Sequence, residues 1–158
     1  MAQSITPFLW FDNQAEEAMN YYLSVFADSE LLSVARYGEA GPGEPGSVMT
    51  AEFLLNDQTF VALNGGPVYT FSPAISFVIN CDSQDEIDHY WGKLSEGGDP
   101  NSQQCGWLKD KYGLSWQVVP SALGQLMSNP ATAGNVMSAL LKMKKLDIKK
   151  LEEAGVAS

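Results

Sequence analysis

The stretch Gly106–Pro120, GWLKDKYGLSWQVVP, decides the fold, because it predicts a short strand, a tight turn and a second strand. Asp110 opens the turn with a side chain that accepts hydrogen bonds from the backbone ahead of it, and Gly113 adopts a positive φ without steric cost. The run Leu114–Val119 is apolar, aromatic and β-branched, which favours a strand, and Pro120 ends it because proline cannot donate to a β-ladder. We expect the rest of the chain to be organised around this hairpin.

The composition is typical of an acidic folded protein. The 158 residues suffice for one domain or two small modules, 45% of them are hydrophobic, and the formal net charge is −10. Nucleic acids and anionic membrane surfaces attract basic proteins, so we expect neither as a partner. Cys81 and Cys105 are the only cysteines, and no apolar run approaches the roughly 18 residues that cross a bilayer. Both features favour a cytoplasmic protein.

The first part of the chain reads as a βαβββ module. Ile5–Phe11 predicts a strand, and Asn13 with Glu16 three residues later predicts a capping box at the start of a helix that extends to about Phe26. A glycine- and proline-rich loop occupies 38–46. The remaining strands are expected at Leu31–Tyr37 and in a hairpin formed by Val48–Leu55 and Thr59–Leu63.

A second, shortened copy of this pattern follows. Ala74–Asn80 predicts a strand, Ser83 with Glu86 predicts a second capping box, and apolar residues then recur at helical spacing up to Leu94. Short strands are expected around Ser102–Leu108 and at Leu114–Val119. The sequence thus predicts an α+β fold of paired βαβββ modules, at about residues 1–68 and 69–120.

Residues 121–158 form a predicted C-terminal helical extension. Helices are expected at Ser121–Met127, Ala131–Lys142 and Asp147–Ala154. An apolar stripe along them is formed by Ala139, Leu140, Met143 and Leu146. A stripe alone does not identify what it packs against, so a dimer arm and a helix packed on its own domain remain equal alternatives.

Several segments together resemble the vicinal-oxygen-chelate (glyoxalase/bleomycin resistance/dioxygenase) superfamily. Within it they are similar to the PhnB-like group, also described as the 3-demethylubiquinone-9 3-methyltransferase domain. The resemblance rests on ITPFLWFDNQAEEAMNYY (5–22), FVALNGG (60–66), AISFVINCDSQDEIDHYW (74–91) and GWLKDKYGLSWQVVP, and it continues into AGNVMSALLKMKKLDIKKLEEA (133–154). It implies an open-barrel cavity in each subunit and usually a homodimer.

Metal-using members of the superfamily place His and Glu ligands at four strand positions. The resemblance carries these positions onto Thr6, onto Ala62 or Asn64, onto Ala74 or Ser76, and onto Gln117. Amide, hydroxyl and methyl side chains are poor ligands for a divalent cation, so we expect no metal and no Lewis-acid chemistry. We also expect no cofactor, because the sequence lacks the glycine-rich turn between a strand and a helix that an adenosylmethionine or dinucleotide site needs.

The expected ligand site is a wall of aromatic side chains with a few amide and hydroxyl groups. Strand alternation places Thr6, Phe8 and Trp10 on one face, and the same argument groups Phe60 with Ala62 and Asn64, and Ala74 with Ser76 and Val78. The predicted ligand-binding residues are Thr6, Phe8, Trp10, Asn64, Ser76, Trp107 and Gln117. Ordinary core packing is the alternative interpretation for each of them taken alone.

Glu52 is the candidate catalytic residue. It lies in the middle of a predicted strand, where a charge is unfavourable unless its face is wet, and facing a cavity it can act as a general base. An exposed sheet face is the competing interpretation. His89 is the only histidine and falls outside the apolar stripe of its helix, so we expect it to face solvent.

Three functions follow from these observations. The first is a cytoplasmic protein that binds a small aromatic or apolar molecule in a cavity without a metal. The second is an enzyme, either a methyltransferase as the family description implies or a metal-independent isomerase or lyase using Glu52 and Asn64. The third is a dimeric interaction module whose C-terminal helices carry the function.

Overall fold

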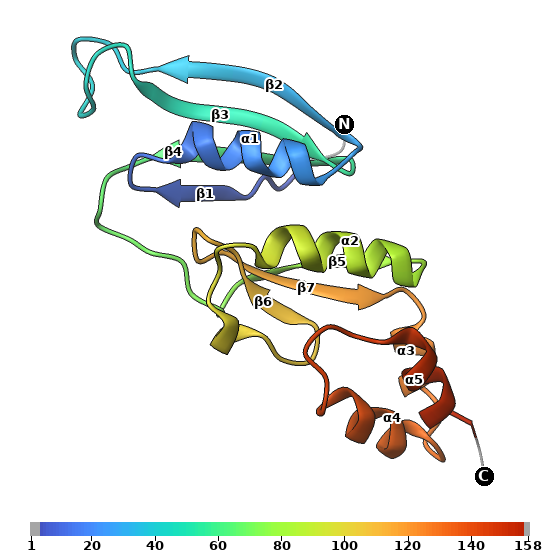
Figure 1. Cartoon of the computed structure of the whole chain (residues 1–158). Helices are drawn as coiled ribbons and strands as arrows, with labels where there is room; N and C mark the ends of the chain where they lie inside the picture. Colours follow the sequence, from blue (N-terminus) through green and yellow to red (C-terminus); the bar gives the residue numbers. More distant parts are fainter. Residues whose placement is uncertain (1–3, 157–158) are drawn as a thin grey trace. The chain divides into compact units, whose positions relative to one another are not determined.

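The structure is a computed structural model that describes residues 4–156. It divides into two compact units, Met1–Phe71 and Ser72–Ser158, and the C-terminal helices belong to the second (Figure 1). The fold is α+β, and each unit contains a small sheet with one helix packed on it, as paired βαβββ modules predict. Among residues 4–156, no helix is both long and apolar enough to cross a membrane.

The first unit contains a four-stranded sheet, called sheet A here, whose strands lie in the order β1-β4-β3-β2. Strand β1 pairs in parallel with β4, and the other neighbours pair antiparallel. Asn56 and Asp57 form the two-residue turn between β3 and β4, with φ of 47° and 69°. Asparagine and aspartate tolerate this conformation better than most residues, which explains the hairpin. The elements are β1 (Phe8–Phe11), α1 (Ala15–Val25), β2 (Ser29–Arg36), β3 (Val48–Leu55) and β4 (Gln58–Asn64).

Helix α1 packs on one face of sheet A and forms the core of this unit (Figure 1). Its residues Ala18, Met19 and Tyr22 are fully buried, as the helical spacing predicts. The Tyr22 ring stacks on Phe53 of β3 at 6.4 Å between centroids, and Phe53 stacks in turn on Phe60 of β4. The face of sheet A that carries Phe53 and Phe60 is therefore the α1 face.

The second unit contains a three-stranded sheet, called sheet B here, with the order β5-β7-β6. This order repeats β1-β4-β3 and lacks a counterpart of β2, so the second module is shortened as predicted. The strand expected around Ser102–Leu108 is the shorter β6, and Ser102 instead ends a 3-10 turn, η1, that precedes it. The elements are β5 (Ser76–Cys81), α2 (Gln84–Ser95), η1 (Pro100–Ser102), β6 (Trp107–Lys109) and β7 (Ser115–Pro120).

The turn between β6 and β7 is built around Asp110, which is 2% exposed. Its Oδ1 accepts hydrogen bonds from the backbone N–H of Tyr112 (2.9 Å) and Leu114 (3.1 Å). Its Oδ2 accepts one from the indole Nε1 of Trp116 at 2.9 Å. Gly113 takes a φ of +87°, which favours glycine. These three hydrogen bonds offset the free-energy cost of burying the Asp110 carboxylate. They stabilise the turn that the sequence predicts.

The C-terminal helices pack together inside the second unit. Val136, Leu146 and Leu151 are fully buried at the centre of this cluster, and Val119 of β7 packs against it. The predicted stripe lies in the same cluster and includes Ala139, Leu140 and Met143. Of the two alternatives, packing on its own unit is the one observed. The helices are α3 (Leu123–Met127), α4 (Ala133–Leu140) and α5 (Ile148–Ala154).

The two predicted capping boxes have different outcomes. Ser83 caps α2 as expected, its Oγ accepting a hydrogen bond from the backbone N–H of Glu86 at 3.2 Å. The box at Asn13 and Glu16 is wrong, because the N-cap of α1 is Gln14 and its side chain makes no capping hydrogen bond. Asn64 of β4 caps this helix instead.

Candidate functional site

Each sheet has a second face, turned away from α1 or α2, which we call its distal face. In sheet A the register pairs Phe8 with Val61 and Trp10 with Leu63. Side chains alternate along a strand and paired residues share a face, so Phe8 and Trp10 lie on the distal face while Leu9 and Phe11 point toward α1. The burial agrees, since Leu9 and Phe11 are buried while Phe8 is 61% exposed and Trp10 is half-buried.

Glu52 lies on the same distal face of sheet A. The register pairs it with Val61, which also faces Phe8, so these three residues form one row across the sheet. The carboxylate is half-buried, in a strand whose neighbouring residues Ala51 and Phe53 are fully buried toward α1. A half-buried carboxylate next to an apolar side chain can take up a proton from a bound molecule.

Trp10 is fixed by contacts within the first unit. Its indole Nε1 donates to the carbonyl of Gly66 at 2.9 Å, and its ring meets Tyr69 edge-on at 5.0 Å between centroids. A Cβ added at Gly65 would overlap the Trp10 ring, so glycine is required where the backbone passes this indole. The FVALNGG segment therefore holds an aromatic surface in place. Thr6 is half-buried just before β1.

The predicted grouping of Phe60, Ala62 and Asn64 with Trp10 is wrong. In the register Phe11 pairs with Asn64, so these three β4 residues lie on the α1 face. The Asn64 side chain is occupied there: its Oδ1 accepts from the backbone N–H of Ala15 (2.8 Å), and its Nδ2 donates to the carbonyl of Val48 (3.1 Å). Its capping of α1 explains an asparagine at this position.

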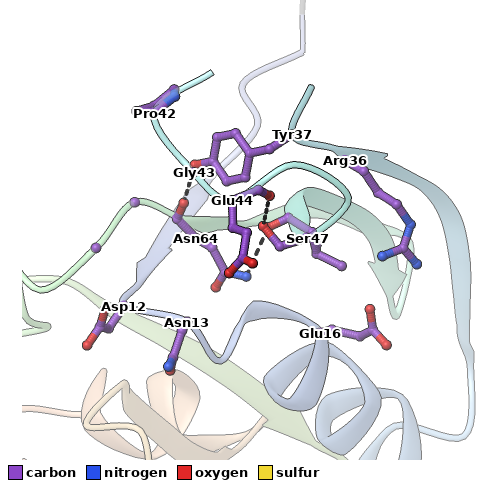
Figure 2. A pocket seen from close by; sticks show the side chains of 13 residues that line it. Asp12, Asn13, Glu16, Arg36, Tyr37, Pro42, Gly43, Glu44, Ser47 and Asn64 are labelled. Atoms are coloured by element: carbon purple, nitrogen blue, oxygen red, sulfur yellow. Dashed lines mark hydrogen bonds between the residues drawn. The ribbon is translucent and has the colours of Figure 1, made fainter. Parts of the chain in front are cut away.

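A pocket of about 580 Å³ opens beside Asn64 at the edge of sheet A where β1 and β4 end (Figure 2). Sequence reasoning did not identify this pocket. The half-buried polar groups in it are already used by the fold, since the Tyr37 hydroxyl donates to the carbonyl of Asn64. Its other charged side chains are exposed: Asp12, Glu16, Arg36 and Glu44. This lining specifies no particular ligand.

The distal face of sheet B brings three of the predicted site residues together. Gln117 pairs with Trp107 across β6 and β7, and its Nε2 donates to Ser76 Oγ at 2.9 Å. Val78 faces the same way from β5 and is 49% exposed. Ser76, Trp107 and Gln117 thus form a half-buried surface that combines an indole, an amide and a hydroxyl group.

Other titratable candidates lie away from these faces. Burial and, to a lesser extent, the carboxylates of Glu86 and Asp82 raise the pKa of the Cys81 thiol to about 11. Cys81 is therefore a protonated, buried thiol at neutral pH, without the thiolate that a nucleophile needs. His89 is exposed on α2, with its ring against Tyr90, as expected for a residue outside the stripe.

The residues present do not fit the superfamily's metal centre. The inherited ligand positions carry Thr6, a β4 side chain that faces α1, Ser76 and Gln117, and the last two hydrogen-bond to each other. Among residues 4–156 no group of three or more His, Cys, Asp or Glu side chains is placed to hold an ion. Neutral hydroxyl and amide groups do not supply the charge or the ligand strength that a divalent transition metal requires.

A nucleotide-type cofactor site does not fit either. Such a site needs a glycine-rich turn that exposes backbone N–H groups at a helix N-terminus. The turn between β1 and α1 is Asp12-Asn13-Gln14, without glycine, and the first helical N–H is already bonded to Asn64.

A model of the 3-demethylubiquinone-9 3-methyltransferase family matches residues 3–119, which ends before α3. The chain is 44% identical to a putative 3-demethylubiquinone-9 3-methyltransferase, PhnB protein, from Bacillus cereus; the match covers 75% of this chain and 99% of that one, with a TM-score of 0.65. None of the curated proteins compared with the chain matches it.

Two more distant structures show the fold alone. A protein from Pseudomonas aeruginosa is 22% identical with a TM-score of 0.60, and the match covers 75% of this chain and 98% of that one. A glyoxylase/bleomycin resistance protein/dioxygenase domain from Frankia sp. is 15% identical with a TM-score of 0.52, over 76% of this chain and 92% of that one.

We expect Asn64→Ala to weaken folding and to leave the distal faces unchanged. The substitution removes the cap of α1 and leaves the Val48 carbonyl without this donor, so the free energy of unfolding should fall by about 2 kcal/mol. Urea denaturation measures this free energy of unfolding. Asn80→Ala, at an exposed position of β5, is the matched control and should change stability by no more than about 0.5 kcal/mol. An Asn64→Ala protein with the wild-type free energy of unfolding would contradict the capping role.

Proposed function

The chain belongs to the 3-demethylubiquinone-9 3-methyltransferase family, the PhnB-like group of the vicinal-oxygen-chelate superfamily, and from this premise we propose that it binds a small aromatic or apolar molecule without using a metal. The binding residues are those of the distal faces. Phe8 and Trp10, with Thr6 just before them in the chain, serve on sheet A, and Ser76, Trp107 and Gln117 serve on sheet B.

The observation that carries the proposal is the pairing of Ser76 with Gln117 beside Trp107. A hydroxyl and an amide that bond to each other can still form hydrogen bonds with a ligand, because the hydroxyl can donate and the amide carbonyl can accept. An adjacent indole supplies a flat apolar surface with one N–H donor. A few oriented polar groups next to aromatic surface are what small-molecule sites consist of.

Phe8 supports the same proposal from the first unit. A phenylalanine that is 61% exposed beside Trp10 leaves apolar surface in water, and such surface is commonly used for binding. A cytoplasmic location and a homodimer stay predictions from the composition and from the family resemblance. Sedimentation velocity measures the oligomeric state directly. The interaction-module alternative has no support from the C-terminal stripe, because that stripe packs in its own unit.

We expect small aromatic and quinone-like compounds to shift the indole N–H resonances of Trp10 or Trp107 in two-dimensional NMR spectra. Trp91 and Trp116 are 8% and 3% exposed and provide internal controls, whose resonances should move much less. Trp10→Phe and Trp107→Phe identify the signals of Trp10 and Trp107, and the two signals that remain belong to Trp91 and Trp116. A broad panel of such compounds that moves neither Trp10 nor Trp107 would refute the proposed function.

An enzymatic role is the second candidate, and the placement of Glu52 in one row with Phe8 favours it. The proposed step is removal of a carbon-bound proton next to a carbonyl group by the Glu52 carboxylate, as in a metal-independent isomerase or lyase. The methyltransferase activity in the family description stays a further prediction, without a fitting cofactor site in the described residues.

This candidate predicts deuterium uptake from heavy water into a carbonyl compound that passes the binding screen. Glu52→Gln should lower the exchange rate by at least about 100-fold, because the amide cannot accept the proton. Glu30→Gln, on exposed β2, is the matched control and should exchange at the wild-type rate. Equal rates in wild type and Glu52→Gln would remove Glu52 from any mechanism.

A further inference from the structure

A small cavity lies at one corner of sheet B, next to η1. It has a volume of about 280 Å³ and is lined by Pro73, Asp99, Asn101, Ser102, Trp107, Leu108, Lys109 and Ser115. The register pairs Lys109 with Ser115, and the alternation along β6 and β7 places both on the distal face together with Trp107. The cavity therefore adjoins the Trp107 surface of the proposed ligand site.

Ser115 is the feature of this cavity that the fold does not explain. The residue is 1% exposed, and its Oγ has no hydrogen-bond partner among the residues that the structure describes. A buried hydroxyl without a partner destabilises a protein, so natural structures rarely retain one without a reason. Alanine would fill nearly the same space without this cost.

The polar neighbours of Ser115 are already engaged. Ser76, its register partner on β5, accepts its hydrogen bond from Gln117. Ser102 of η1 accepts a hydrogen bond from the backbone N–H of Lys109 at 3.0 Å. Among the described residues, the Ser115 hydroxyl is thus the buried side-chain polar group of this corner that makes no hydrogen bond.

The lining indicates which chemical group would complete the site. Lys109 is the single cationic side chain among the described residues that line the cavity. The carboxylate of Asp99 is used to cap η1, where it accepts from the backbone N–H of Asn101 at 2.9 Å. A hydroxyl donor near an ammonium group favours an oxygen acceptor, and charge assistance strengthens such a bond. The volume is below the roughly 300–1,000 Å³ of complete ligand pockets, so it fits one end of a molecule.

We propose that this cavity is a subsite for the carboxylate or carbonyl end of an aromatic ligand, with Ser115 Oγ donating to that oxygen and Trp107 contacting the ring. The inference rests on the proposed function and adds the ligand's class and its orientation. Ser115 is a specificity-determining residue in this arrangement, because it separates ligands with an acceptor oxygen from purely hydrocarbon ones.

The test compares benzoate with toluene, which lacks the acceptor oxygens. Binding to wild type and to Ser115→Ala is followed by NMR through the Trp107 indole resonance, and Ser138→Ala, at an exposed position of α4, is the control. Benzoate should bind wild type and Ser138→Ala equally and Ser115→Ala at least about tenfold more weakly, the loss expected for a hydrogen bond to a charged acceptor. The toluene affinity should be the same for all three proteins.

A second measurement separates a ligand-binding role of Ser115 from a structural one. Ser115→Ala should unfold at a higher urea concentration than wild type, because it removes a buried hydroxyl without a partner. A lower midpoint would show that the hydroxyl serves the fold and would overturn the inference.

The binding outcomes distinguish the inference from the proposed function. Benzoate that binds Ser115→Ala as well as wild type would overturn the subsite and leave small-molecule binding intact, as would shifts confined to Trp10. If neither benzoate, toluene nor the wider aromatic panel moves Trp10 or Trp107, both proposals fail.

Discussion

The alternation of side chains along each strand is the constraint on which the structure depends. In both units one helix covers one face of a small sheet, and every second residue of the central strands must then be apolar and buried. Phe53 and Phe60 fulfil this requirement beneath α1, and Val118 and Ile79 fulfil it on the helix side of sheet B. The residues in between lie on the distal faces, and these are the ones available for function.

Two polar side chains fix this arrangement at particular points. Asp110 fixes the β6–β7 turn and the Trp116 indole through three hydrogen bonds. These bonds determine which side chains of β7 point toward α2 and which lie on the distal face. Asn64 joins the N-terminus of α1 to the end of β4 and to Val48, which ties the helix to its face of sheet A. Asp110 and Asn64 therefore have structural roles, whereas Ser76, Gln117 and Ser115 are proposed to bind a ligand.

The sequence predicted what local signals determine. The turn at Asp110 and Gly113, the hairpin of Val48–Leu55 with Thr59–Leu63 and the Ser83 cap all depend on residues close together in the chain, and they form as expected, although β4 begins one residue earlier, at Gln58. The faces of single strands were also predictable, which placed Phe8 with Trp10. Asn64 was misplaced because its face depends on the register between β1 and β4, which joins segments about fifty residues apart.

The same limit applies to the rest of the candidate site. No sequence signal marks Ser115, because its lack of a hydrogen-bond partner becomes evident only when Ser76 of β5 and Ser102 of η1 are known to bond to other groups. The pocket beside Asn64 likewise involves a loop, a helix terminus and two strand ends that are separate in the sequence. The positions of Ser76 and Gln117 could be identified from the family resemblance, because metal-using relatives carry ligands at both positions.

Serine and glutamine at these two positions change the chemistry that the site can perform. Hydroxyl and amide groups recognise a neutral or anionic molecule through hydrogen bonds, whereas the His and Glu side chains of metal-using relatives supply a Lewis acid. We therefore propose an organic ligand site that uses no metal. Elemental mass spectrometry on purified protein, loaded with Mn, Fe, Co, Ni and Zn and then desalted, tests it most directly. The account predicts that no metal is retained in stoichiometric amount. Stoichiometric retention of any of them would contradict it and would make Glu52 or His89 candidate ligands.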